Sequence, residues 1–285
     1  MLIFLSLVAC DAPAADSGDG AEAGDSGRPA VMGTLVEMWT DPAPVVAGEA
    51  VEFYEHVTDQ DGNSLDDLQR NHERYVHTIF VSRDLASFTH THMEDFTDPL
   101  PTDAIRASTF HFPITFPLSG EYLAIFDYAR ENQWIQTLAA LSVAGDVSQL
   151  DAAEQDFSTT VAAGDLTVSL SWEVDPAAEV DSIWNAHITT AAGQDVTDLV
   201  PWLGADGHSV LVNEGLTWAS HTHAWFPDME GMTPSMTMPH LYSGPDLPFH
   251  YVFPAGGTYK MWVQFRRESA PDVVYAAPFM FRVSG

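Results

Sequence analysis

The feature that most constrains this chain is an internal repeat, in which the two halves of the sequence match over most of their length. When the sequence is shifted by 131 residues, Phe53–Met93 overlies Trp184–Ala224 without a gap. Further along, Phe116–Tyr122 and Phe253–Tyr259 share the pattern Phe-Pro-x-x-Gly-x-Tyr. Because such self-similarity marks a structural unit that occurs twice, we predict two tandem domains at residues 32–144 and 158–285, joined by a linker at residues 145–157.

Each repeat has the residue pattern of a β-rich domain. Large apolar residues alternate with other residues in runs such as Phe110, Phe112, Ile114, Phe116 and Tyr259, Met261, Val263, Phe265. Alternation with a period of two places one set of side chains on a single buried face of a sheet. Turn signals such as Asp61-Gly62 and Gly256-Gly257 separate the runs. The pattern predicts an all-β chain with two antiparallel β-sandwich domains, either Ig-like or cupredoxin-like.

The first residues predict export and a lipid anchor. An apolar run ends in Leu7-Val8-Ala9-Cys10, which resembles a lipobox, although no Lys or Arg precedes it. We expect a signal peptide at residues 1–9, a lipidated Cys10, a flexible tether at residues 10–31, and a location on the periplasmic or cell-surface side of a membrane. The alternative is an ordinary apolar start with a chance cysteine. Cys10 is the single cysteine, and its lipidation would leave no thiol, so we expect neither a cysteine metal site nor a blue-copper site.

The charge of the chain restricts its partners. Asp and Glu number 41 against 10 Lys and Arg, which gives a formal net charge of −31. A surface of this sign is repelled by phosphate backbones, so we expect no nucleic-acid partner. The same charge favours cations, although a solvated acidic exterior is the simpler explanation of the charge itself.

Histidines occupy matching positions in the two repeats: His77, His90 and His92 overlie His208, His221 and His223. The last two of each set form a His-x-His pair, and residues i and i+2 of a strand share a face about 7 Å apart. Two imidazoles so placed can bind one metal ion. A hairpin would bring the first histidine of each set, thirteen residues upstream, beside the pair. We therefore predict all six as metal ligands.

His111 and His250 are interpreted as a further matched pair and as possible fourth ligands. Both lie on a strand before the shared Phe-Pro, five and three residues upstream of it. Imidazole ligands suit zinc, copper, nickel and iron. The alternative interpretation is structural, because histidines matched between repeats would also occur if their rings bonded backbone groups inside a sandwich.

A methionine-rich segment in the second repeat points to copper. Met229, Met232, Met236, Met238 and His240 lie within twelve residues, beside prolines and a glycine. Thioethers are soft ligands that select Cu(I), so the segment predicts a Cu(I)-binding loop. The alternative is a loop that covers apolar surface with adaptable methionine side chains. Copper is therefore the expected metal, with zinc as the alternative.

The strand that begins at His77, the following Phe88-Thr-His90-Thr-His92 and the later Gly120-Glu-Tyr strand resemble small exported β-sandwich domains of copper-handling proteins. Each repeat resembles the YtkA-like and CopC-like groups of such domains, mainly over residues 50–130 and 181–267. The resemblance implies copper binding or delivery in the periplasm without catalysis, and a periplasmic metal-handling protein as partner. This chain departs from the resemblance in one respect. The usual copper ligand of such domains is a histidine at the mature N-terminus, and here that position would be the lipidated Cys10.

No enzyme signature is present, such as a His-Glu-x-x-His motif, a Gly-x-Ser-x-Gly elbow or a P-loop. We therefore expect a binding protein and no enzyme. The rival hypothesis is a tethered Ig-like module that binds proteins or glycans and whose histidines are structural. The two hypotheses differ in whether the repeated histidines converge within coordination distance.

Overall fold

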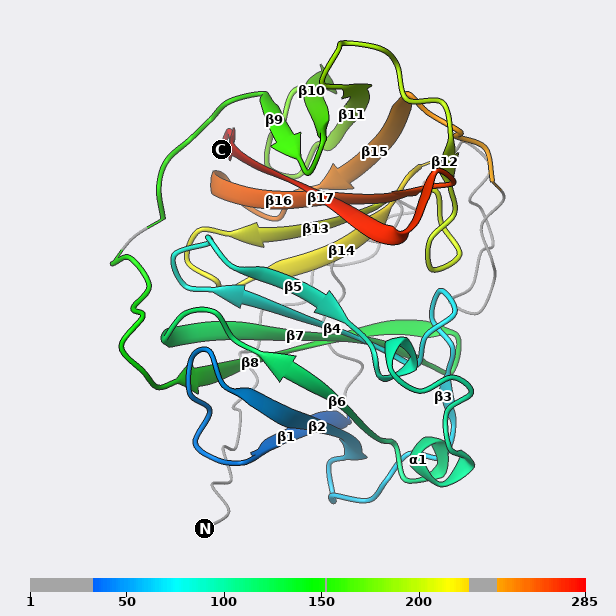
Figure 1. Cartoon of the computed structure of the whole chain (residues 1–285). Helices are drawn as coiled ribbons and strands as arrows, with labels where there is room; N and C mark the ends of the chain where they lie inside the picture. The colour runs from blue at the N-terminus through cyan, green and yellow to red at the C-terminus, as the bar shows by residue number, and fades with distance from the viewer. Residues whose placement is uncertain (1–32, 152, 226–239) are drawn as a thin grey trace.

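The computed structural model describes residues 33–151, 153–225 and 240–285, and these ranges fold almost entirely into β-strands (Figure 1). The predicted lipidation site at Cys10, the tether at residues 10–31 and the Met229–Met238 segment lie outside the described residues. No helix in the described ranges has the length and apolar character needed to cross a membrane.

The first repeat forms a two-sheet sandwich. Its elements are β1 (Thr34–Asp41), β2 (Ala50–Asp59), β3 (Leu68–Gln69), β4 (Val76–Ser82), β5 (Phe88–Thr91), the 3₁₀ turn η1 (Met93–Asp95), α1 (Thr102–Arg106), β6 (Thr109–Thr115), β7 (Gly120–Arg130) and β8 (Gln133–Val143). One sheet has the strand order β1-β2-β6, and the other has the order β3-β7-β4-β5 with β8 paired to β7. All of these strand pairs are antiparallel.

The second repeat builds a sandwich of the same kind. Its strands are β9 (Thr160–Ala163), β10 (Leu166–Val174), β11 (Asp181–Thr190), β12 (Leu199–Val200), β13 (His208–Asn213), β14 (Ala219–His223), β15 (Asp246–Val252), β16 (Gly257–Arg267) and β17 (Ala270–Val283). One sheet has the order β15-β11-β10-β9, and the other has the order β12-β16-β13-β14 with β17 paired to β16. The predicted all-β fold with two repeated antiparallel domains is confirmed.

The alternating apolar residues fill the two cores. Phe110, Phe112, Ile114 and Phe116 are all buried in the first sandwich, as Tyr259, Met261, Val263 and Phe265 are in the second. Burial of aromatic and aliphatic side chains on the inner faces stabilises each domain, at about 1.5–3 kcal/mol for a fully buried large side chain. The period-two pattern is therefore explained by one inward and one outward face per strand.

Strand β4 departs from this rule, because every residue from Val76 to Ser82 is buried. Phe80 points into the core of its own sandwich, whereas Ile79 and Val81 belong to a separate apolar cluster. That cluster joins the two domains: Ile79, Val81, Leu85, Leu123 and Ile125 of the first pack with Val210, Val212, Ala219, Trp262 and Met280 of the second. The ring of Phe88 stacks on Trp262 across this boundary, with the ring centroids 4.6 Å apart.

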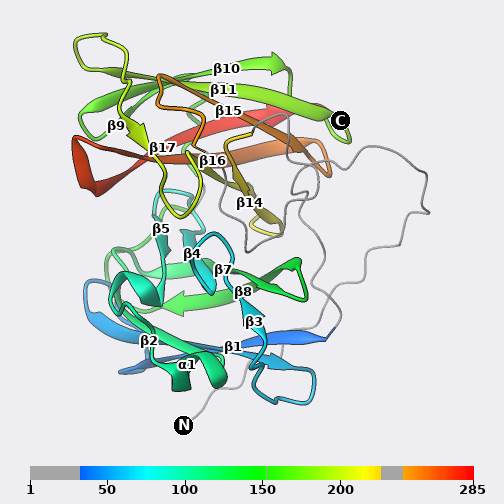
Figure 2. The same ribbon diagram turned by 90° about the vertical axis from the view of Figure 1, so that its right-hand side faces the viewer.

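The two sandwiches are therefore stacked face to face. The sheet containing β4 and β5 lies against the sheet containing β13, β14 and β16, and the sheets β1-β2-β6 and β15-β11-β10-β9 form the two outer layers (Figure 1, Figure 2). Both faces of the inner sheets are covered, which explains why β4 and β13 have no solvent-exposed face.

Candidate metal centre

The six repeated histidines all lie on the inner sheets, on the faces that meet between the domains. In the second domain β13 and β14 form an antiparallel hairpin that pairs His208 with His223 and Val210 with His221. In the first domain β4 and β5 pair in the same way, with Ile79 opposite His90. The first histidine of each set is therefore beside the His-x-His pair, on the same face as the apolar residues of the domain boundary.

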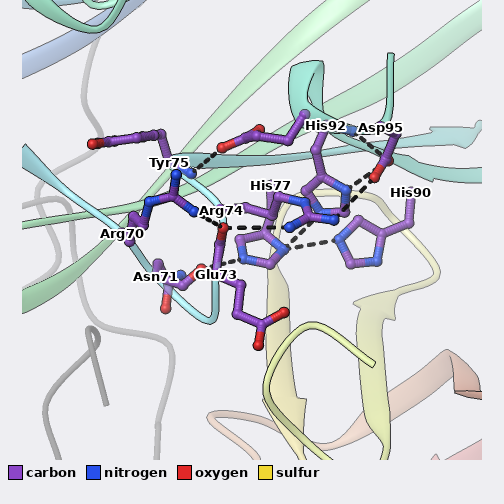
Figure 3. A network of polar contacts seen from close by, with 10 residues as sticks. Arg70, Asn71, Glu73, Arg74, Tyr75, His77, His90, His92 and Asp95 are labelled. Atoms are coloured by element: carbon purple, nitrogen blue, oxygen red, sulfur yellow. Dashed lines mark hydrogen bonds and ion pairs between the residues drawn. The ribbon is translucent and has the colours of Figure 1, made fainter. Parts of the chain in front are cut away.

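In the first domain, three ring nitrogens converge. His77 Nδ1 lies 3.1 Å from His90 Nε2 and 2.9 Å from His92 Nε2 (Figure 3). His77 and His92 have no solvent exposure. We call His77, His90 and His92 the first triad.

The second domain repeats part of this arrangement with its own three histidines, which we call the second triad. Nε2 of His223 has no hydrogen-bond partner among the described residues, unlike Nε2 of His92. His208 Nδ1 lies 3.1 Å from His221 Nε2, the same pair of atoms as in the first triad. One ligand atom each from His208, His221 and His223 lie within 4.8 Å of one another, and so do those of His77, His90 and His221. Because His221 belongs to both groups, the two triads form one continuous cluster that spans the domain boundary.

The outer nitrogens of these rings are held by hydrogen-bond acceptors. His77 Nε2 donates to the carbonyl oxygen of Asn71 at 2.9 Å, and the equivalent His208 Nε2 donates to the carbonyl oxygen of Trp202 at 2.7 Å. His92 Nδ1 donates to Oδ2 of Asp95 at 2.8 Å. A neutral imidazole carries one N–H, so each donation leaves the other ring nitrogen with a bare lone pair. In all three residues that bare nitrogen faces the cluster or its neighbouring histidine.

Two further outer contacts cross from one domain to the other. His90 Nδ1 lies 2.9 Å from Oε1 of Gln264, and His221 Nδ1 lies 3.0 Å from Oδ2 of Asp127. Asp127 is paired with His77 in the sheet, and Gln264 is paired with His208, so both partners occupy the same position in their repeats. Each domain thus positions one histidine of the other, and the cluster is complete only when the domains are docked.

Burial keeps these imidazoles neutral. Desolvation is the largest cause that lowers the pKa of His77, His90, His221 and His223 well below the usual value. The same cause lowers the pKa of His208 to about 3. Neutral imidazole is the form that binds metal ions, so the burial holds these residues in their ligand form.

The other predicted ligands lie elsewhere. His111 is on the outer sheet of the first domain, where Nδ1 lies 2.5 Å from Oε1 of Glu52. His250 is on the outer sheet of the second domain, 2.9 Å from Oδ1 of Asp181. As fourth ligands of the triads these two assignments are corrected, because each strand turns these side chains outward, away from the sandwich core.

The proposed equivalence of His111 and His250 also needs correction. His111 pairs with Tyr54, whereas His250 pairs with Ile183, which corresponds to Glu52 in the first repeat. The two histidines are therefore two residues out of register, although both point outward. Among the residues of the predicted Cu(I) loop, His240 is described, and its Nδ1 lies 2.5 Å from Oδ1 of Asp206. The four methionines lie outside the described residues.

Several residues of the cluster are absent from the sequence-based set. Asp127, Gln264 and the carbonyl oxygens of Asn71 and Trp202 hold the outer ring nitrogens. His72 is also added, since its ring lies against that of His223 with centroids 3.8 Å apart. The repeat contained a signal for Asp127 and Gln264, because both follow the Gly-x-Tyr pattern by five residues.

Comparison with known sequences identifies the family of both halves. A family model described as a domain of unknown function, DUF8832, matches residues 31–145 and 159–285. The chain belongs to the DUF8832 family. Each copy of the DUF8832 domain contains the three histidines of one triad. Among curated proteins, no sequence matches the chain.

Several solved structures have segments similar to this chain. The soluble domain of PmoD from Methylocystis sp. is 18% identical, with 45% of this chain and 98% of that chain covered and a TM-score of 0.27. The Escherichia coli adhesin FdeC is 16% identical, with 88% and 64% covered and a TM-score of 0.25. A pair of fibronectin type III domains from chicken tenascin is 8% identical, with 87% and 98% covered and a TM-score of 0.23.

Proposed function

We propose that this protein binds transition-metal ions, with copper as the expected metal, in the histidine cluster between its two DUF8832 domains. The observation that carries the proposal is the convergence of bare ring nitrogens in the first triad. His77 Nδ1 faces Nε2 of His90 and of His92 at 3.1 and 2.9 Å, while the other nitrogen of each ring is held by an outer acceptor.

Lone pairs at this separation repel one another unless a cation lies between them. A proton is disfavoured here, because burial lowers the pKa of His77 and of His90. A metal ion removes the repulsion directly. Metal–nitrogen bonds of about 2.0 Å in tetrahedral geometry hold their ligands about 3.3 Å apart, so a small outward movement of each ring accommodates an ion.

The donor set supports a borderline or soft transition metal. The converging atoms are neutral imidazole nitrogens, whereas Mg²⁺ and Ca²⁺ prefer oxygen ligands. Copper binds nitrogen sites more tightly than the neighbouring divalent metals, and zinc is the alternative. Six imidazoles exceed the four ligands of one tetrahedral ion. We therefore propose two ions, one in each triad.

The proposed role is binding, buffering or delivery of the metal, without catalysis, on the periplasmic or cell-surface side of a membrane. The lipobox-like Leu7–Cys10 supports a lipid anchor, and a periplasmic metal-handling protein is the proposed partner. Expression of the chain with Cys10→Ser tests the anchor. The wild type should fractionate with membranes and the variant should not; equal fractionation would contradict the proposed anchor.

Metal titration of the full chain tests the proposed function. We expect two copper ions per chain by mass spectrometry, and fewer in His90→Ala, which keeps the strand but loses a ligand. The matched control is His111→Ala, which removes an exposed histidine on the outer sheet and should leave the stoichiometry at two. Circular dichroism checks that each variant is folded. A wild type that binds neither copper nor zinc at micromolar concentration would exclude the proposal and favour the interaction module.

A further inference from the structure

His72 lies in a tight turn between β3 and β4. Asn71 and Arg74 exchange backbone hydrogen bonds of 2.6 and 3.0 Å around this turn. The two central residues, His72 and Glu73, have φ angles of 45° and 72°. A two-residue turn of this kind favours Asn-Gly, because both central residues take the left-handed conformation. Side chains other than Gly and Asn are disfavoured there, and such strain is concentrated at functional sites.

The turn delivers the imidazole of His72 across the domain boundary. Its ring contacts the ring of His223 with centroids 3.8 Å apart, although the two residues belong to different domains. His72 is 5% exposed, and so is His223. Within the second triad the ring contact of His72 is with His223, and the ligand atom of His223 lies within 4.8 Å of those of His208 and His221.

Both rings carry a buried nitrogen without a partner. Among the described residues, neither Nδ1 of His72 nor Nε2 of His223 has a hydrogen-bond partner, and both atoms are inaccessible to solvent. An unsatisfied buried polar atom costs about 1–3 kcal/mol, so native proteins rarely retain one without a function. Two such atoms on rings in contact point to a ligand that both can bind, and a metal ion satisfies both at once.

The same turn in the second domain has different residues. Trp202 and Ala205 exchange the backbone hydrogen bonds, and the position equivalent to His72 is Leu203, with a φ of 51°. Instead of an imidazole, this turn presents the indole of Trp202 to the first triad. Its ring lies 5.4 Å from that of His90 and 6.4 Å from that of His92, measured between centroids. The two triads thus have equivalent histidines but different fourth neighbours.

We propose that His72 is a fourth ligand, supplied by the first domain to the metal position formed by His208, His221 and His223. This inference rests on the proposed metal-binding function and makes the two positions chemically distinct. The second triad becomes a four-imidazole site, a donor set that Cu(II) accepts in tetragonal geometry. The first triad stays a three-imidazole site covered by Trp202, and three-coordination is a geometry that Cu(I) accepts.

Paramagnetic resonance of the full chain loaded with one equivalent of Cu(II) tests the inference. We expect the wild type to show coupling to four histidine nitrogens, which labelling with ¹⁵N-histidine identifies. In His72→Leu, which places the residue of the second turn at this position, the count should fall to three. The first binding constant should weaken by about 100-fold or more, since even loss of an outer partner of a ligand costs about 10–100-fold.

His72→Asn guards against a folding defect, because Asn tolerates a positive φ and keeps the turn. His111→Leu is the matched control and should retain four nitrogens and the wild-type affinity. Three nitrogens in the wild type, or unchanged spectra and affinities in both His72 variants, would overturn the role of His72. In that case the proposed function would stand, because copper would still bind. A wild type without any copper binding would remove both proposals.

Discussion

His221 of the second domain donates its Nδ1–H to Oδ2 of Asp127 in the first domain, over a distance of 3.0 Å. The equivalent contact in the other direction joins His90 to the amide oxygen of Gln264. A carboxylate accepts a stronger, charge-assisted hydrogen bond than an amide and raises the basicity of the ring. The first triad has a carboxylate partner as well, Asp95 on His92, but the Asp95 side chain is 36% exposed and that of Asp127 only 7%. Solvent screens a buried carboxylate less, so the second triad should bind a cation more tightly.

Asp127→Asn tests this asymmetry. The substitution keeps the size of the side chain and a hydrogen-bond acceptor but removes the charge, so we expect the copper affinity of the second triad to fall by about 10–100-fold. The reciprocal Gln264→Glu should strengthen binding at the first triad. Competition titrations with a chelator of known affinity measure both effects. Equal affinities in Asp127→Asn and wild type would show that the carboxylate does not tune His221.

Acid should destabilise the metal-free protein through its buried histidines. Burial lowers the pKa of His72 to about 4 and that of His208 to about 3, against a usual value of 6.5. At a pH between the lowered value and 6.5, the unfolded chain binds more protons than the folded chain. The free energy of unfolding therefore falls as the pH drops below about 6.5. Each such histidine contributes a slope of up to about 1.4 kcal/mol per pH unit.

Urea unfolding of the metal-free chain at several pH values between 4 and 7.5 measures this slope. His208→Gln should reduce it, because His208 is one of the buried histidines with a lowered pKa. In the folded chain protons compete with copper for the same nitrogens only as the pH approaches these lowered pKa values, so copper should bind more weakly towards pH 4. A flat stability profile below pH 6.5 would contradict burial of neutral imidazoles.

The buried carboxyl group of Glu55, in the first domain, should give the opposite pH dependence: its contribution to stability should fall as the pH rises. Burial raises the pKa of Glu55 from 4.5 to about 8, while a hydrogen bond from Thr78 lowers it and the charge of Glu94 raises it. Glu55 binds its proton more tightly in the folded state. Its contribution to stability is complete below about pH 4.5 and is lost as the pH rises towards 8.

Glu55→Gln should therefore make the protein more stable than the wild type at pH 8.5 and leave the two similar at pH 4.5. The second repeat has Ala186 at the equivalent position, so the effect should be confined to the first domain. Thermal unfolding at the two pH values gives the measurement. If the variant were less stable than the wild type at pH 8.5, Glu55 would have to be ionised without penalty in the folded protein.

The sequence was sufficient for the fold but not for the docking of the domains. Alternating residues such as Phe110 and Phe112 predicted the sheets correctly, because period-two patterning reports the inner face of a single sandwich. It carries no information about which outer face meets another domain. The consecutive apolar residues Ile79-Phe80-Val81 contained that signal, since a strand with apolar residues on both faces must be covered on both sides.

In the candidate site, too, the sequence could predict contacts within one domain but not those that depend on the docking of the two domains. The hairpin that brings His208 beside His223 could be anticipated from their spacing, because hairpin pairing is local. His72 could not, since its contact with His223 depends on the docking of the two domains and the repeat places Leu203 at its equivalent position. His111 was misassigned because the shared Phe-Pro does not fix the strand register.

Docking of the domains should be coupled to metal binding, and Trp262 tests this coupling. Its ring stacks on Phe88 across the domain boundary and is 4% exposed. Trp262→Ala removes a large buried side chain, which typically costs about 3–5 kcal/mol. Because Asp127 and Gln264 reach their histidines only in the docked state, the variant should also bind copper more weakly at both triads.

Thermal unfolding with and without copper separates this coupling from simple loss of stability. A ligand that binds only the docked, folded state raises its stability according to concentration and affinity, so saturating copper should recover part of the loss in Trp262→Ala. Trp39→Ala is the matched control, because Trp39 is 43% exposed and stacks on Tyr54 in the outer sheet. It should leave the copper affinity unchanged. Wild-type copper affinity in a folded Trp262→Ala chain would mean that each triad binds its ion without help from the opposite domain.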